Sequence, residues 1–94
     1  RFACLPLALS LAAAAFAQSA AVWEDRALQA EITGNLMGAE SAYRRAVETS
    51  QGDAERLTTT ANLLQFLVRF DRFAEARPLA RQLEQLASTA PTTG

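Results

Sequence analysis

The stretch GNLMGAESAYRRAV, residues 34–47, predicts a tight turn followed by an amphipathic helix. Gly34 favours the turn, because glycine readily adopts the left-handed backbone conformation that ends many helices. After it, Ala39, Tyr43 and Ala46 recur at the spacing of one helical face. These residues are small or aromatic, so we expect the helix to pack closely against a neighbour through this face.

The same spacing returns further along the chain, in DRFAEARPLARQL, residues 71–83. The offset between the two stretches is 37 positions, as from Ala39 to Ala76. Periods of about 34 to 47 residues are typical of repeated helix–turn–helix units. The echo therefore predicts two copies of one unit, with these residues at the matching positions of the second copy: Asp71, Ala76, Ala80 and Leu83.

Helical spacing and the turn residues predict four helices, at about 20–33, 36–49, 54–69 and 72–87. Alanine, leucine, glutamate, glutamine and arginine are abundant while glycine and proline are sparse, which favours helix. The predicted turns are short, as in helical hairpins, so consecutive helices should lie antiparallel.

Individual polar residues predict local detail. Glu40 and Arg44 stand four positions apart in the order that favours an ion pair on the helix surface. Asp53 and Asp71 precede predicted helices and are candidates for N-terminal caps. Pro78 removes one backbone hydrogen bond from the fourth helix.

Composition excludes several classes of function. The chain has 94 residues, enough for one small domain, and contains no His and a single Cys. The usual zinc sets, Cys–His nucleophile pairs and an internal disulfide are therefore excluded. Nine basic residues, all of them Arg, against ten acidic residues leave a net charge of −1, so we expect no nucleic-acid partner.

Catalysis and cofactor binding find no support either. The neighbouring carboxylates are accounted for as helix caps or as solvated helix faces. No glycine-rich phosphate loop is present, since GNLMGAE lacks the lysine and the preceding strand that such a loop requires. We therefore expect no cofactor and no enzymatic activity.

The first 17 residues predict a secretory signal peptide. Arg1 gives a positive start, residues 5–17 form a largely apolar run, and Ala15 and Ala17 are the small residues of a cleavage site. Cys4 precedes the apolar run, so it is not a lipidation site. We expect export to the periplasm or the exterior of a bacterium. The alternatives are an uncleaved membrane tether over residues 5–22 and a buried helix of the core.

The repeated pattern resembles the tetratricopeptide repeat, through these residues of the first copy: Trp23, Ala27, Gly34, Ala39, Tyr43 and Ala46. The second copy departs from the family pattern, with Asp71 for the glycine, Ala80 for the aromatic residue and Leu83 for the last alanine. The resemblance implies an all-α fold in which antiparallel hairpins stack as a short α-solenoid of about two repeats. The hairpins would cover about 20–50 and 53–88 within a domain 18–88, followed by a linker or disordered tail at 89–94. The alternative is an alanine-rich four-helix bundle.

The resemblance also implies where a partner would bind. In such repeats the first helix of each hairpin lines a concave surface that takes a peptide or a helix. The residues that would face it are Glu24, Leu28, Glu31 and Ile32 in the first helix and Thr58, Asn62, Gln65 and Arg69 in the third. These side chains could hydrogen-bond a peptide backbone or a carboxylate.

The expected function is therefore an exported scaffold that binds a protein or peptide. Self-association is a second kind of partnership, because about three repeats are usually needed for stability. Two alternatives remain open at this point. The chain could be the N-terminal part of a larger exported protein or enzyme, or a helical module held at a membrane by an uncleaved leader.

The intact mass of the exported protein tests the leader. We expect a mature chain that begins at Gln18, because cleavage should follow Ala17. Mass spectrometry of the purified exported form measures this directly. A mass that retains Phe16 or earlier residues would contradict the predicted cleavage site.

Overall fold

The computed structural model describes residues 19–89, and these form four α-helices without a strand. The helices are α2 (Ala20–Ile32), α3 (Leu36–Glu48), α4 (Asp53–Arg69) and α5 (Phe73–Thr89). The all-α prediction is confirmed. The predicted signal peptide, residues 1–17, lies outside the described residues, as do residues 90–94 of the predicted tail. None of the four described helices combines the length and the apolar character that crossing a bilayer requires.

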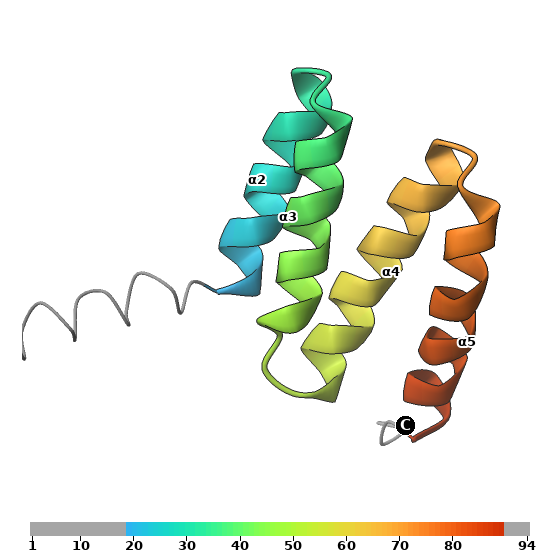
Figure 1. Cartoon of the computed structure of the whole chain (residues 1–94). Coiled ribbons are helices and arrows are strands. Elements are labelled where there is room, and N and C mark those ends of the chain that lie inside the picture. The colour runs from blue at the N-terminus through green and yellow to red at the C-terminus, as the bar shows by residue number, and fades with distance from the viewer. Residues whose placement is uncertain (1–18, 90–94) are drawn as a thin grey trace, which may run out of the picture.

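Figure 1 shows two helical hairpins that stand side by side, α2 with α3 and α4 with α5. The turns within both hairpins lie at the same end of the molecule, and the loop from α3 to α4 lies at the other end. Helix α3 contacts α4, so the chain passes from one hairpin to the next without a long crossover.

The turn of the first hairpin is built around Gly34, whose φ is 82°. The Gly34 N–H donates to the carbonyl of Glu31 at 3.0 Å, and the Asn35 N–H donates to the carbonyl of Ala30 at 2.8 Å. This pair of bonds is the Schellman motif, which satisfies carbonyl groups left open at a helix C-terminus.

The turn of the second hairpin repeats this motif 37 positions later, with Asp71 in place of Gly34. The φ of Asp71 is 61°, the only positive value at a non-glycine residue in the described part of the chain. Its N–H donates to the carbonyl of Val68 at 3.1 Å, and the Arg72 N–H donates to the carbonyl of Leu67 at 2.8 Å. Asp71 is therefore not the cap of α5, as its sequence context predicted. It takes the left-handed position of the turn, and α5 begins two residues later.

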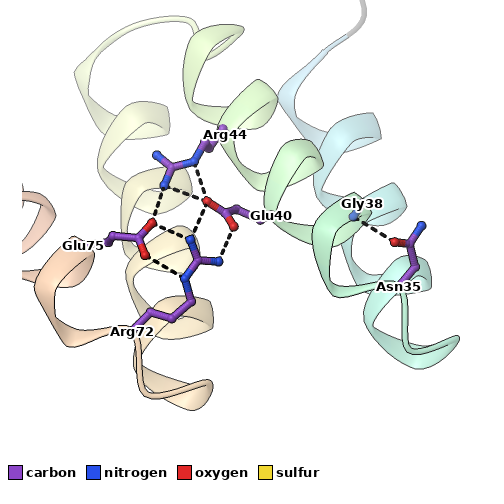
Figure 2. A network of polar contacts seen from close by, with 6 residues as sticks. All are labelled: Asn35, Gly38, Glu40, Arg44, Arg72 and Glu75. Atoms are coloured by element: carbon purple, nitrogen blue, oxygen red, sulfur yellow. Dashed lines mark hydrogen bonds and ion pairs between the residues drawn. The ribbon is translucent and has the colours of Figure 1, made fainter.

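Helix α3 begins with a side-chain cap. Asn35 Oδ1 accepts from the Gly38 N–H at 3.0 Å (Figure 2). Gly38 suits this position because it has no Cβ. A Cβ added here would collide with the Asn35 amide.

Helix α4 begins differently from the prediction. Its N-cap is Gly52, with a φ of 87° and no side-chain capping bond, and Asp53 is the first helical residue. Its carboxylate does not serve as the predicted cap, although negative charge in a first turn is favourable. The Glu55 carboxylate reaches back instead and accepts from the Gln51 N–H at 2.7 Å.

Helix α5 extends to Thr89, two residues beyond its predicted end. The hydroxyls of Ser88 and Thr89 both donate to the carbonyl of Gln85, at 2.9 and 3.1 Å, and so occupy an acceptor of the last turn. Pro78 lies inside α5 without ending it.

The core joins the two hairpins through aromatic rings. The Phe66 ring of α4 packs against the Tyr43 ring of α3, with centroids 5.2 Å apart, and against Phe70 at 5.1 Å. Ala27, on α2, is fully buried, and α2 and α3 are in contact. The other buried members of this core cluster are Ala39, Ala42, Leu63, Leu67 and Ala76.

Trp23 lies at the margin of this core, half-buried, between two arginine side chains. The guanidinium carbon of Arg26 lies 4.8 Å from the centre of the indole ring, and that of Arg45 lies 5.5 Å from it. Since Arg26 belongs to α2 and Arg45 to α3, both cation–π contacts fall within the first hairpin.

Substitution of Asp71 by glycine should stabilise the fold. Glycine adopts a positive φ without the steric cost that a Cβ imposes, and the change also removes a negative charge from a helix C-terminus. We expect a gain of up to about 1 kcal/mol in the free energy of unfolding, measured by urea denaturation.

Asp71→Ala is the matched control, because it removes the same charge but keeps the Cβ. We expect this variant to gain less stability than Asp71→Gly, because its Cβ still opposes the positive φ. An equal gain from both substitutions would show that the charge of Asp71, and not its backbone conformation, lowers the free energy of unfolding.

Candidate functional site

A groove of about 610 Å³ runs between α2 and α4 and is the strongest candidate site in the described part of the chain. Its lining residues are Glu24, Leu28, Glu31, Ile32, Tyr43, Asn62, Gln65 and Arg69. The structure thus brings together all of the residues predicted for the concave surface except Thr58. Tyr43 joins them, although the sequence indicated only a packing role for it.

The walls of the groove are linked by two polar contacts between α2 and α4. Asn62 Nδ2 donates to the carboxylate of Glu24. Arg69 Nη2 donates to both carboxylate oxygens of Glu31, each at 2.9 Å. Each contact joins residues 38 positions apart, so both hold the first hairpin to the second.

Tyr43, on α3, also contacts Glu31. Its hydroxyl donates to Glu31 Oε2 at 2.5 Å. Burial, together with this bond to a carboxylate, raises the pKa of Tyr43 above its usual value. The bond to Glu31 likewise raises the pKa of Arg69. The Glu31 charge therefore has two donors, one from each hairpin, which accounts for a carboxylate held in a largely covered position.

Apolar side chains lie exposed in the same groove. Leu28 is 52 % exposed and Ile32 is 72 % exposed, one helical turn apart on α2. Gln65 is exposed on α4, and about half of the Arg69 side chain remains exposed beside its ion pair. The groove thus combines apolar surface with hydrogen-bond donors, the combination that binding sites use for affinity and orientation.

A second polar cluster lies between α3 and the start of α5, and Figure 2 shows its four members, Glu40, Arg44, Arg72 and Glu75. The Arg72 side chain donates to the Glu40 carboxylate from both terminal nitrogens, and its Nε donates to Glu75 at 2.8 Å. Arg44 Nε donates to Glu40 at 3.0 Å, which confirms the ion pair predicted within this helix. We call this cluster the polar network.

Charge alternates around the polar network. The hydrogen bond from Arg72 lowers the pKa of Glu40, and its bonds to Glu75 and Glu40 raise the pKa of Arg72. Every charge has an opposite neighbour, so the polar network joins the two hairpins and shows none of the like-charge pairing that prepares an acid or a base for catalysis. Within residues 19–89, no group of three or more potential metal ligands is gathered in one place.

Comparisons with protein families, with curated proteins and with solved structures found no match for this chain.

The polar network should make stability depend on pH in the acid range. The folded-state pKa of Glu40 lies below its ordinary value of 4.5, so its contribution is complete above that pH and is lost as pH falls through the folded-state pKa. Glu40→Gln should lower the free energy of unfolding by about 1 kcal/mol or less at pH 7, because the network is partly exposed to solvent. The difference from the unmodified protein should shrink below about pH 4.5.

Urea denaturation between about pH 3 and pH 7 measures this difference. Glu48→Gln, on an exposed residue of the same helix, is the matched control and should change stability little. A Glu40→Gln effect that is the same at both ends of this range would contradict the electrostatic explanation.

Proposed function

We propose that this chain is an exported helical-repeat scaffold of tetratricopeptide-like type. It binds a protein or peptide in the groove between α2 and α4 and has no catalytic activity of its own. The observation that carries the proposal is the groove, where exposed Leu28 and Ile32 lie beside the donors of Gln65 and Arg69. Export rests on the leader pattern of the first 17 residues.

Two features support the repeat class. The same Schellman motif ends α2 and α4 at a separation of 37 residues, which matches the period in the sequence. The hairpins also stack through Phe66 on Tyr43, so that each covers apolar surface that the other exposes. A helical repeat gains its stability from such contacts with the neighbouring unit.

The chemistry of the groove favours a peptide that brings an apolar side chain to Leu28 and Ile32. A carbonyl or carboxylate of the same peptide would accept from Arg69 or Gln65. Glu24 and Glu31 already accept hydrogen bonds from the opposite wall, so they serve mainly to hold the groove open at a fixed width.

Ile32→Asp should weaken peptide binding without affecting the fold, because Ile32 is exposed and contributes little to the core. Peptides selected from a random library against the full chain provide the ligand, and fluorescence anisotropy measures the dissociation constant. We expect an increase of at least about tenfold, equivalent to about 1.4 kcal/mol of binding free energy.

Met37→Asp is the matched control, since Met37 is 86 % exposed and does not line the groove. It should leave the dissociation constant nearly unchanged. Ile32 and Met37 are better positions for this test than Asn62 and Arg69. Alanine substitutions at Asn62 and Arg69 would also remove contacts that connect the hairpins. Selected peptides that bind both aspartate variants equally well would place their site elsewhere and refute the proposal.

A further inference from the structure

A second surface lies at the outer side of the second hairpin, away from the groove. It contains a pocket of about 370 Å³. The pocket is lined by Leu64, Val68, Phe73, Ala76, Arg77 and Ala80. Phe73 is 52 % exposed and Val68 is 45 % exposed. We call this surface the end face.

The repeat period shows what the end face corresponds to. Shifted back by 37 positions, its lining residues become Ala27, Glu31, Leu36, Ala39, Glu40 and Tyr43. In the first hairpin that surface is covered by the second: Tyr43 packs on Phe66, and Glu31 binds Arg69. The end face is therefore the position at which the second hairpin would receive a further helical element.

The end face differs from its counterpart in shape. Ala80 stands at the position of Tyr43, so the space that the tyrosine ring fills in the first hairpin is open in the second. Val68 stands at the position of Glu31, which makes this part of the surface apolar. An incoming element would have to supply the missing ring.

The end face also differs in charge. Arg77 stands at the position of Glu40, which binds Arg72 in the junction between the hairpins. Arg81 follows at the position of Arg44. No carboxylate among residues 19–89 forms an ion pair with Arg77 or Arg81. The charge of the end face is thus reversed at Arg77, and a complementary partner would bring a carboxylate there.

The other end of the molecule, on the first hairpin, is poorly suited to pack on the end face of a second copy stacked head to tail. Its outer surface carries Arg26, Gln29 and Thr33, all exposed. These residues stand 37 positions before Leu63, Phe66 and Phe70. Phe66 packs on Tyr43 of the first hairpin, Leu63 belongs to the same buried cluster, and Phe70 packs on Phe66. A copy stacked in this way would place polar side chains on an apolar surface, which is unfavourable.

We propose that the end face binds an amphipathic helix or helical hairpin of a partner protein. The partner brings an aromatic side chain to the space over Ala80 and a carboxylate to Arg77. This surface is separate from the groove, so the proposal stands or falls independently of peptide binding there.

The test uses the full chain and two synthetic probes copied from its own second hairpin. The first probe has the sequence of residues 53–89, and the second has the same sequence with Arg72→Glu, which places a carboxylate opposite Arg77. Circular dichroism first establishes that the two probes have the same helix content. By fluorescence anisotropy we expect the glutamate probe to bind at least about tenfold more tightly than the arginine probe.

Two substitutions in the full chain identify the surface. Arg77→Glu should reverse the preference between the probes, because it restores the charge that Glu40 has in the first hairpin. Ala80→Tyr should strengthen binding of the glutamate probe, because it restores the ring on which Phe66 packs in the contact between the hairpins. Ile32→Asp, in the groove, should have no effect on either probe.

Three results would overturn the proposal. Absence of binding by both probes, when circular dichroism shows that they are helical, would show that the end face does not accept a helical hairpin. A preference that Arg77→Glu leaves unchanged would show that the probes bind elsewhere, for example by replacing α4. Light scattering that finds the chain dimerising alone, with Arg77→Glu abolishing the dimer, would identify a second copy as the occupant.

Discussion

The contact between Phe66 and Tyr43 is the interaction on which the rest of the structure depends. A single pair of helices cannot bury its apolar face alone, and this contact is where the two pairs cover each other. Ala27 and Ala39 are fully buried in the same cluster, and the Tyr43 ring packs on Phe66 of α4. The same residue then places its hydroxyl in the groove, so one side chain both closes the core and sets the position of Glu31.

Polar contacts lie on both sides of this aromatic contact and limit rotation of one hairpin against the other. Glu31 with Arg69 joins α2 to α4, and Glu40 with Arg72 joins α3 to the start of α5. Individually, such partly exposed ion pairs contribute little stability. Placed on either side of a packed core, they define an angle between the hairpins. If the groove binds a ligand as proposed, walls held in this way need little rearrangement, which reduces the cost of binding.

Local periodicity was sufficient to predict the helices, because residues three or four apart share a helical face whatever the tertiary structure. Leu28, Glu31 and Arg69 were expected in one groove only because the resemblance to a repeat family implies that the first helix of each hairpin lines it. The groove contact of the Tyr43 hydroxyl could not be predicted, because it depends on the position of α3 relative to α2. The link from Glu40 to Arg72 spans 32 residues, so it exists only once the hairpins have docked. Asp71 was misread for a related reason: aspartate suits both a cap and a left-handed turn, and the bonds of the preceding helix decided between them.

The placement of Trp23 between Arg26 and Arg45 has an optical consequence. It is the only tryptophan of the chain, and its two cationic neighbours come from α2 and α3 alone. Its emission therefore responds to the opening of the first hairpin, whereas the far-ultraviolet signal sums over all four helices. Superimposable transitions by the two signals mean that the hairpins unfold as one cooperative unit, and separated transitions mean that one opens before the other. The protein thus carries an intrinsic probe that distinguishes the stability of one hairpin from the stability of the contact between the hairpins.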